Sequence, residues 1–433
     1  MLISYSFENF RSFRNIAKIS MVATPQTTLN DNLIRLKQKR FLPSAVIYGA
    51  NASGKSNIIL SLKVLKKIII SGSISSSDED LNALELYPFI HEEKNRPISF
   101  EIEFINNNIH CIYVLEINVD KCNRGGERYI SKEELYLKSQ SKNTLIYRRT
   151  KDNINISTER SALMYMNLSK NFILEIQKKL TKNMDESVLF LTSGFKSIIS
   201  NKFADCVISF FSDKLLIIDN FTTMSSNLRF KSKQTIEKDF IIWNEVLEGF
   251  VKGADFGPQQ ILFKSNTDTS DEHTADMKLY SVYLNGNKPM FIPARIMESV
   301  GTLKMIDFAL IFQNFFSLGC VFLMDEFDAS LHPEIVKGII ALFHDPEFNK
   351  NGSQLIFTTH NPIYLNNKIF RRDQIMFVEK DKENFQSEIY TLADFGSTEV
   401  RNDENYLINY FKGKYSSMPY IDFSSLISQE DDE

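Results

Sequence analysis

A glycine-rich stretch near the N-terminus has the spacing of a phosphate-binding loop. Residues 49–56 read GANASGKS, which fits the pattern GxxxxGK[ST]. An apolar run at 44–48 precedes the loop, and an apolar stripe with helical spacing follows it from Ile58 to Ile69. In such a strand–loop–helix setting, backbone N–H groups and the positive end of the helix dipole bind phosphate oxygens. An ordinary Gly/Ser-rich turn is strongly disfavoured by this context.

The side chains of this loop have distinct expected roles. Lys55 is predicted to reach the β and γ phosphates, and the Ser56 hydroxyl to coordinate Mg²⁺. The glycines allow the backbone to approach the phosphates closely. The residues predicted to contact the ligand from this segment are Gly49, Asn51, Ala52, Ser53, Gly54, Lys55, Ser56 and Asn57.

Two carboxylates follow a second apolar run. Residues 320–324 lead directly into Asp325 and Glu326. Ligands of α/β proteins bind at the carboxyl ends of the strands, so Asp325 is predicted to hold Mg²⁺ through water and Glu326 to polarise an attacking water. Taken alone, an acidic turn at a strand end is an equally good interpretation.

A histidine follows the next strand pattern. Residues 354–358 are mainly apolar, and Thr359, His360 and Asn361 come directly after them. A single histidine is more often structural than catalytic. Its place after the strand that follows an acidic pair favours a position one strand away, in contact with a γ phosphate. Glu326 and His360 are therefore the candidate catalytic residues.

Ser299 and Gly301 stand just before a helical stretch at 303–315. A serine hydroxyl, a glycine and a helix start can form an anion-binding site. From these residues alone, a plain helix N-cap at Ser299 or Thr302 is the favoured interpretation.

The elements that would position these residues fall into three parts. Residues 1–150 contain the loop and several strand patterns, including a hairpin with its turn at 106–108. Helical spacing begins near residue 161, and an Asn-Gly pair at 285–286 predicts another hairpin. We predict one lobe at 1–150, a mostly helical insertion or lid at 151–280, and a second α/β lobe at 281–433.

Composition narrows the class of protein. The 433 residues are 43% hydrophobic with a net charge of −4, which suits packed cores and gives no general attraction to nucleic acid. Four scattered cysteines without CxxC spacing predict reduced thiols. No signal peptide and no apolar run of membrane-spanning length is evident, so we expect a cytoplasmic protein without membrane contact.

These motifs together resemble those of ABC-type ATPases of the RecF, SMC and OLD group. They are most similar to the small stand-alone AAA-15-class ATPases of bacterial phage-defence and abortive-infection operons. Asp325 and Glu326 match the Walker B motif and catalytic glutamate, and His360 resembles the switch histidine. The other resembling segments are the opening strand (8–13), Walker A (45–57), a degenerate signature motif (298–302), the D-loop (328–333) and C-terminal blocks (371–380, 401–405, 413–415).

The resemblance implies a fold, a ligand and a mechanism. The fold would be an α/β ABC-ATPase head of the P-loop NTPase class, with an antiparallel β subdomain and a mostly helical insertion. Two heads would pack head-to-tail around ATP and Mg²⁺, with a higher oligomer also open. Ser299 and the Gly301 amide would cap the γ phosphate of the partner's nucleotide, and Arg11 would join the nucleotide-binding residues.

The chain departs from the family pattern at several points. The signature lacks the full LSGGQ sequence, and no Q-loop glutamine is recognisable, although the segment 87–89 is a candidate replacement. No long coiled coil is present, and no acidic TOPRIM-type cluster follows His360. We therefore expect an ATPase without its own nuclease.

Three functions remain open from the sequence. The first is a sensor or regulator of a separate effector protein, such as a nuclease, in anti-phage defence. The second is a RecF-like DNA-binding ATPase of repair or maintenance, with basic segments at 37–40, 148–151 and 178–182 as candidate DNA contacts. The third is a chain that binds nucleotide only as a structural ligand. The sequence does not fix the effector, the trigger, or adenine over guanine.

Overall fold

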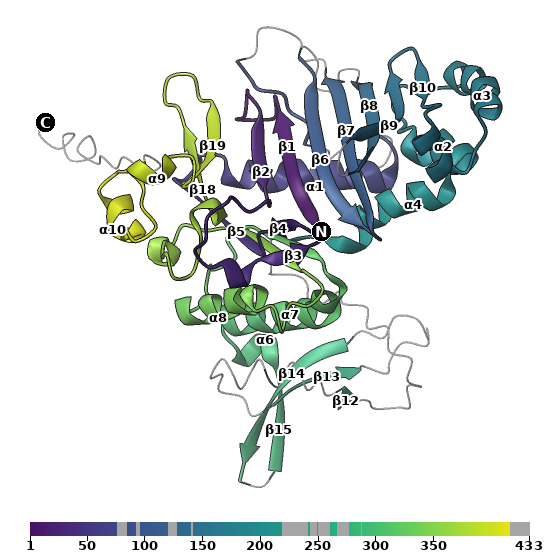
Figure 1. Ribbon diagram of the computed structural model, residues 1–433. Coiled ribbons are helices and arrows are strands. Elements are labelled where there is room, and N and C mark those ends of the chain that lie inside the picture. The colour runs from purple at the N-terminus through teal and green to yellow at the C-terminus, as the bar shows by residue number, and fades with distance from the viewer. Residues whose placement is uncertain are drawn as a thin grey trace, which may run out of the picture.

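The computed structural model describes residues 1–75, 85–91, 96–119, 128–139, 142–218, 241–242, 249, 260–265, 277–286 and 288–415. The two largest sheets in this part of the chain are one that is mainly parallel and one that is antiparallel (Figure 1). The candidate site lies at one edge of the parallel sheet, so the sheet order decides which residues can meet.

The parallel sheet has the order β11-β16-β17-β5-β18-β19. All neighbours are parallel except β18 and β19, which are antiparallel. Every residue of β5, β16 and β17 is buried, which explains their continuous apolar sequences. The strands are β5 (Ser44–Gly49), β11 (Leu215–Ile218), β16 (Val321–Met324), β17 (Gln354–Thr358), β18 (Ile375–Lys380) and β19 (Ser387–Thr391).

The antiparallel sheet has the order β10-β9-β8-β7-β6-β1-β2. Its predicted turn is confirmed, because Asn107 and Asn108 both have positive φ angles between β6 and β7. The strands are β1 (Leu2–Glu8), β2 (Ala17–Ser20), β6 (Ile98–Asn106), β7 (Ile109–Val119), β8 (Arg128–Lys138), β9 (Asn143–Thr150) and β10 (Ile154–Ile156). A small hairpin of β3 (Ile34–Leu36) and β4 (Lys39–Phe41) forms a separate two-stranded sheet beside the segment that follows β2.

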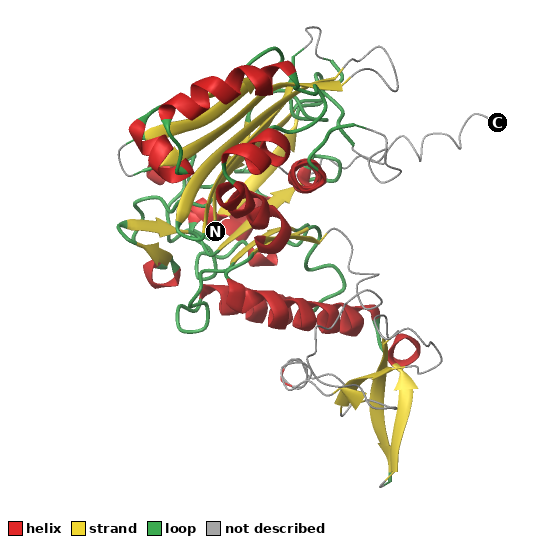
Figure 2. Cartoon of the chain, turned by 90° about the vertical axis from the view of Figure 1, so that its right-hand side faces the viewer, coloured by secondary structure: helices red, strands yellow, loops and turns green. Residues whose placement is uncertain are grey.

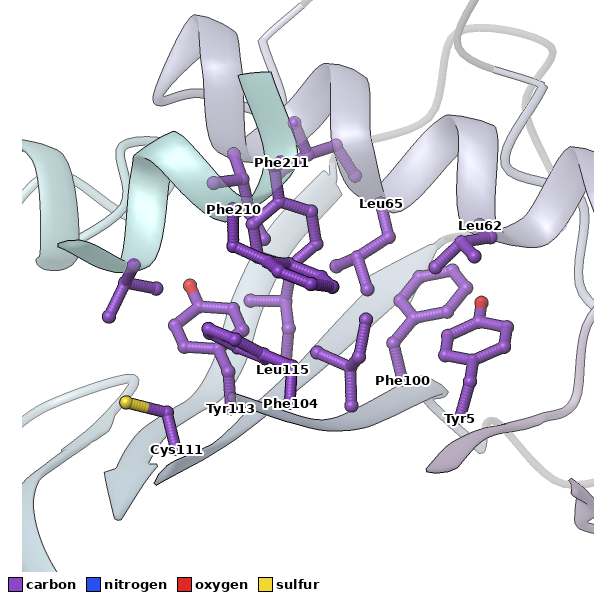
Figure 3. Close-up of a cluster of buried hydrophobic side chains, with 14 of the residues drawn as sticks. Tyr5, Leu62, Leu65, Phe100, Phe104, Cys111, Tyr113, Leu115, Phe210 and Phe211 are labelled. Atoms are coloured by element: carbon purple, nitrogen blue, oxygen red, sulfur yellow. The ribbon is translucent and has the colours of Figure 1, made fainter. Parts of the chain in front are cut away.

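Helix α1 (Lys55–Ser71) lies between the two sheets and forms the first hydrophobic core with them. Figure 3 shows Leu62 and Leu65 of α1 facing Phe100 and Phe104 of β6. The side chain of Phe104 stacks on that of Phe210, with ring centroids 4.2 Å apart. This packing fixes the axis of the helix that begins at the phosphate loop.

The second core covers the other face of the parallel sheet. Residues of α7 (Val300–Phe315) and α8 (Pro333–His344) pack there against alternate residues of β5, β16 and β17. Short helices α6 (Ala294–Met297), α9 (Gly396–Glu399) and α10 (Tyr406–Phe411) complete this half of the chain. Both faces of the sheet are thus covered, as is usual for parallel sheets.

The prediction of a mostly helical segment at 151–280 is right only in its first part. Helices run to residue 214, namely α2 (Arg160–Met166), α3 (Lys170–Lys182), a π-helical segment (Leu191–Ile199), α4 (Asn201–Ser209) and a short turn (Phe210–Lys214). The run Leu-Leu-Ile-Ile of β11 then enters the parallel sheet, because four consecutive apolar residues suit a strand buried on both faces.

The later described residues of this segment form an antiparallel sheet of order β12-β13-β14-β15. The predicted Asn285-Gly286 turn is confirmed, since it joins β14 to β15 with Gly286 at φ 62°. Figures 1 and 2 show this hairpin projecting from the rest of the chain. The strands are β12 (Ile241–Ile242), β13 (Gln260–Ser265), β14 (Met277–Asn285) and β15 (Lys288–Pro293). The division into three domains stays a prediction.

Two further sequence expectations concern cysteines and membranes. Cys111, Cys206 and Cys320 are buried free thiols, while Cys122 lies outside the described residues. In the described part of the chain, no helix has the length and apolar character needed to cross a bilayer.

Candidate active site

The phosphate loop connects β5 to α1, as its spacing predicts. A Cβ atom on Gly49 would lie 2.5 Å from the carbonyl oxygen of Val378 in β18. Gly54 has φ 116°, and its Cβ would lie 2.8 Å from the Ser387 hydroxyl. Both positions therefore require glycine, one because of close strand approach and the other because of its backbone conformation.

Lys55 is buried at the start of α1 and points back into the loop. Its Nζ donates to the carbonyl oxygens of Gly49 at 2.8 Å and Ala50 at 3.0 Å. Burial lowers the pKa of the amine to about 8, while the charges of Asp325 and Glu326 oppose that shift. The amine thus lies in a partly desolvated position near both carboxylates, where a phosphate oxygen would compete with the two carbonyls.

The remaining loop residues differ in their exposure. Asn51, Ala52 and Ser56 are exposed, with Ser56 in the first turn of α1. Ser53 is buried, and its hydroxyl has no hydrogen-bond partner among the described residues. Asn57 donates from Nδ2 to the Ser12 hydroxyl at 2.9 Å. A glycine-lined loop with an unpartnered buried hydroxyl fits a bound phosphate chain.

Asp325 and Glu326 follow β16 and are held by a threonine from the neighbouring strand. The Thr358 hydroxyl donates to Asp325 Oδ1, and the backbone N–H of Glu326 donates to the same hydroxyl at 2.8 Å. Glu326 has φ 45°, an uncommon conformation for a residue with a side chain. Its side chain is 61% exposed, so the carboxylate reaches solvent beside the loop.

His360 lies one strand away from the acidic pair, as predicted, because β17 pairs with both β16 and β5. Its Nε2 is 3.9 Å from Glu326 Oε1. Burial and the nearby Lys55 charge lower the pKa of His360, whereas Glu326, Asp328 and Asp325 raise it by smaller amounts. The neutral imidazole is therefore favoured at neutral pH.

The start of α7 is attached to the loop that follows Glu326. A Cβ on Gly301 would lie 2.3 Å from the Ser330 carbonyl oxygen. Lys304 is buried, and its Nζ donates to the carbonyl oxygens of Glu326 and Ala329, both at 3.0 Å. Burial lowers the pKa of this lysine to about 8. Helix α7 and the loop that follows Glu326 are thereby joined.

Ser299 is the N-cap of α7, since its hydroxyl accepts from the Thr302 backbone N–H at 3.1 Å. Within the described residues, no hydrogen bond or ion pair connects Ser299 or Gly301 to the phosphate loop. Within one chain, Ser299 therefore acts as a helix N-cap. Its contact with the nucleotide of a second chain stays a prediction.

Arg11 belongs to a tight loop that touches the phosphate loop through its neighbour Ser12. The Ser387 backbone N–H donates to the Ser12 carbonyl oxygen at 2.7 Å, and the Ser387 hydroxyl donates to the Ser53 carbonyl oxygen at 2.6 Å. Arg11 itself forms an ion pair with Glu85. Arg11, which the sequence predicts to contact the nucleotide, therefore lies next to the residue that touches the phosphate loop, and its side chain is paired with Glu85.

Ser56 and Asp325 are the predicted metal-holding residues. Mg²⁺ usually keeps several waters and takes only one or two protein ligands together with phosphate oxygens. Among the described residues, no cluster of three or more His, Cys, Asp or Glu side chains could hold a metal ion by itself. One hydroxyl and one carboxylate beside a phosphate loop suit Mg²⁺ brought with a nucleotide.

Sequence reasoning missed Thr358 and Lys304. A polar residue at the end of the apolar strand 354–358 was a signal for Thr358, although its partners depend on the sheet order. Lys304 carried no signal, because a lysine near a helix start is usually exposed. Here the close approach of the D-loop backbone to α7 covers it.

The basic segment 148–151, a candidate for DNA contact, makes contacts within the protein. Arg149 is fully buried and donates to the carbonyl oxygens of Val188 and Asp185, while Arg148 pairs with Glu134. Lys151 lies 3.6 Å from Glu186. Arg149 and Lys151 connect the antiparallel sheet to the helical segment after it, whereas Arg148 pairs within the sheet.

A protein-family model matches residues 44–163 and 214–366, more than half of the chain. Its description is "AAA domain, putative AbiEii toxin, Type IV TA system". The matched segments include the phosphate loop, the signature region, the acidic pair and His360. No curated protein matches the chain significantly.

Among solved structures, three SMC heads are similar to the chain. An SMC head bound to the C-terminal winged-helix domain of ScpA is 15% identical, with 92% of this chain and 99% of that chain covered and a TM-score of 0.40. The Thermotoga maritima SMC head is 15% identical, with 90% and 98% covered and a TM-score of 0.35. A Pyrococcus furiosus SMC head with an extended coiled coil, bound to the C-terminal domain of ScpA, is 14% identical, with 90% and 96% covered and a TM-score of 0.39.

These TM-scores are below 0.5, so the family assignment rests on the family model. The fold rests on the observed parallel sheet, with the phosphate loop after β5 and the acidic pair after β16. The chain therefore belongs to this AAA-domain family, and it has the α/β fold of a P-loop ATPase head with an antiparallel β subdomain.

Proposed function

We propose that this protein binds and hydrolyses MgATP, and that two copies close over each nucleotide. The observation that carries the proposal is the meeting of four side chains from adjacent strand ends. Lys55 lies near Asp325 and Glu326, and His360 lies 3.9 Å from Glu326. Such a set can bind phosphates, hold a metal ion and direct a water molecule.

The roles follow from position and charge. Lys55 and the amides of residues 49–56 would bind the β and γ phosphates. Ser56 and Asp325 would hold Mg²⁺, which would supply positive charge to neutralise the phosphates. Glu326, whose side chain is 61% exposed, orients and polarises the attacking water. His360, neutral and adjacent, contacts a γ phosphate oxygen.

Closure by a second copy is supported by the position of Ser299 and Gly301. They lie at the start of α7, where helix amides favour an anion. Within one chain, Ser299 accepts a hydrogen bond from Thr302, and Gly301 lies against the carbonyl oxygen of Ser330. A head-to-tail dimer would bring this helix start to the partner's nucleotide.

In the cell, we propose that the ATPase senses or regulates a separate effector in bacterial anti-phage defence. Two observations support this role. The family description names a toxin of type IV toxin–antitoxin systems. In addition, no group of three or more His, Cys, Asp or Glu side chains among the described residues could hold a metal ion as a metal-dependent nuclease does. In this proposal, a separate protein is the effector.

The central test is ATP turnover and molecular mass with and without MgATP, for the wild type and Glu326→Gln. We expect slow turnover by the wild type. The variant should bind ATP, turn it over far more slowly and become a dimer with MgATP, because binding stabilises the closed state. Lys55→Ala should weaken binding through loss of a charge-assisted contact. Normal turnover by both variants would show that the site is elsewhere.

A further inference from the structure

Gly54 of the phosphate loop is enclosed by the hydroxyls of two serines from different parts of the chain. A Cβ atom at Gly54 would lie 2.8 Å from the Ser387 hydroxyl and 2.9 Å from the Ser12 hydroxyl. Ser387 is the first residue of β19, and Ser12 lies in the turn between β1 and β2. Figure 1 shows β2 and β19 side by side, which explains how two serines far apart in sequence meet at this loop.

The Ser387 hydroxyl fixes the direction of one peptide bond in the loop. It donates to the Ser53 carbonyl oxygen at 2.6 Å. The carbonyl and the N–H of a trans peptide point in opposite directions, so the Gly54 N–H points away from Ser387. Within the described part of the chain, this N–H donates to no other group. An amide of a phosphate loop that is held in one direction and has no partner is a donor ready for a phosphate oxygen.

Ser12 supports Ser387 and connects it to the first turn of α1. Its carbonyl oxygen accepts from the Ser387 backbone N–H at 2.7 Å, and its hydroxyl accepts from Asn57 Nδ2 at 2.9 Å. The turn that contains Ser12 is itself fixed, because Phe10 and Phe13 are fully buried and exchange two backbone hydrogen bonds of 2.9 Å. The opening motif of the sequence thus ends in a turn that supports the phosphate loop.

We propose that Ser387 is a positioning residue of the phosphate loop, which holds the Gly54 N–H toward a bound phosphate, with Ser12 as its support. This inference rests on the proposed nucleotide binding. Without the hydroxyl, the Ser53 carbonyl loses its partner and the peptide can rotate, because a glycine at position 54 permits both orientations. Only molecules with the N–H in the correct direction then bind phosphate well, and the apparent affinity falls by that fraction.

The test measures the binding of MgATP and of magnesium tripolyphosphate by calorimetry. Ser387→Ala should weaken the binding of both ligands by about 5- to 30-fold, because both place a phosphate in the loop. Ser387→Cys has nearly the same shape and a weaker donor, so its affinities should lie between those of the wild type and Ser387→Ala. The cysteine variant also decides the question if the alanine variant does not fold.

Ser353→Ala is the matched control. Ser353 is also buried, and its hydroxyl donates to the Phe316 carbonyl oxygen at 2.7 Å. It precedes β17, at the opposite edge of the parallel sheet from the phosphate loop. Both alanine variants should lower the Tm, since each loses a buried hydrogen bond, but Ser353→Ala should bind both ligands like the wild type.

The outcomes separate this inference from the proposed function. If Ser387→Ala binds both ligands like the wild type, or no more weakly than Ser353→Ala, the positioning role is wrong and the proposed nucleotide binding stands. A loss of affinity for MgATP alone would also overturn the positioning role. A wild type that binds neither ligand would overturn both proposals.

Discussion

The hydroxyl of Thr358 serves both acidic residues of the site at once. It donates to Asp325 and accepts from the backbone of Glu326, which adopts a left-handed conformation there. A single hydroxyl thus orients the carboxylate proposed to hold Mg²⁺ and fixes the backbone of the residue proposed to direct water.

Thr358→Val should slow ATP turnover by about 10- to 100-fold, the usual cost of removing a side chain that orients a metal-holding carboxylate. The valine has nearly the same shape, so packing is kept while both hydrogen bonds are lost. Steady-state turnover as a function of Mg²⁺ concentration measures the effect. Thr358→Ser keeps the hydroxyl and should stay close to the wild type. Normal turnover by Thr358→Val would show that the bridge has no catalytic importance.

Individual chemical roles could be inferred from local sequence where the motif is contiguous. Lys55 and Ser56 belong to one eight-residue pattern, and Asp325 and Glu326 end one apolar run. Thr358 could not be assigned, because its partners come from a different strand. Only the pairing of β16 with β17 makes them neighbours.

At the scale of elements, α7 is joined to residues 326–330, the loop that holds the proposed catalytic Glu326. Lys304 contributes two hydrogen bonds to backbone carbonyls of that loop, and Gly301 permits the close approach. Movement of the α7 start would therefore change the position of Glu326. The sequence predicted the helix and the loop separately, but the contact between them depends on their packing in three dimensions.

Lys304→Met should lower kcat for ATP by about 10- to 100-fold with little change in KM, because a displaced catalytic group impairs chemistry more than binding. The methionine fills similar space but leaves the Glu326 and Ala329 carbonyl oxygens without the amine. Lys304→Arg should recover part of the rate. As a matched control, Lys337→Met on α8 removes a more exposed lysine that pairs with Glu334 and should keep normal kinetics. A rise in KM alone would contradict a positioning role for Lys304.

At the scale of the whole molecule, one buried histidine joins the two ends of the second core. His344 ends α8, and its Nε2 is 2.7 Å from the hydroxyl of Ser44 at the start of β5. Burial lowers the pKa of His344 from 6.5 to about 4. The unfolded chain therefore takes up a proton below pH 6.5 that the folded chain takes up only near pH 4.

The free energy of unfolding should consequently fall as the pH decreases through this window. His344 should account for a loss of about 2 kcal/mol between pH 7 and pH 5. Urea denaturation of the wild type and His344→Gln at both values measures this contribution as the difference between their pH dependences. Parallel pH dependences of the two proteins would contradict a buried neutral histidine.

The parts of the fold that could be predicted are those in which residues close in sequence form one strand, one helix or one strand–loop–helix. The strand–loop–helix around Lys55 and the strands before Asp325 and His360 were placed correctly. The later part of region 151–280, from β11 on, was not, because β11 continues an apolar spacing that also suits a helix. Residues 215–218 form a strand because they pair with β16 at the edge of the parallel sheet. This long-range pairing cannot be predicted from the local sequence.

Because β11 is the edge strand beside β16, a movement of the helices before it could reach Asp325 and Glu326. Strand β11 follows α4 after one short turn, and the Asp325 backbone N–H donates to the Ile218 carbonyl oxygen at its end. Tension on the helices would be transmitted along four residues and would peel an outermost strand, one hydrogen bond after another. The last bond to open would be the one that anchors Asp325, so the strand would tether the helices to the carboxylate proposed to hold Mg²⁺.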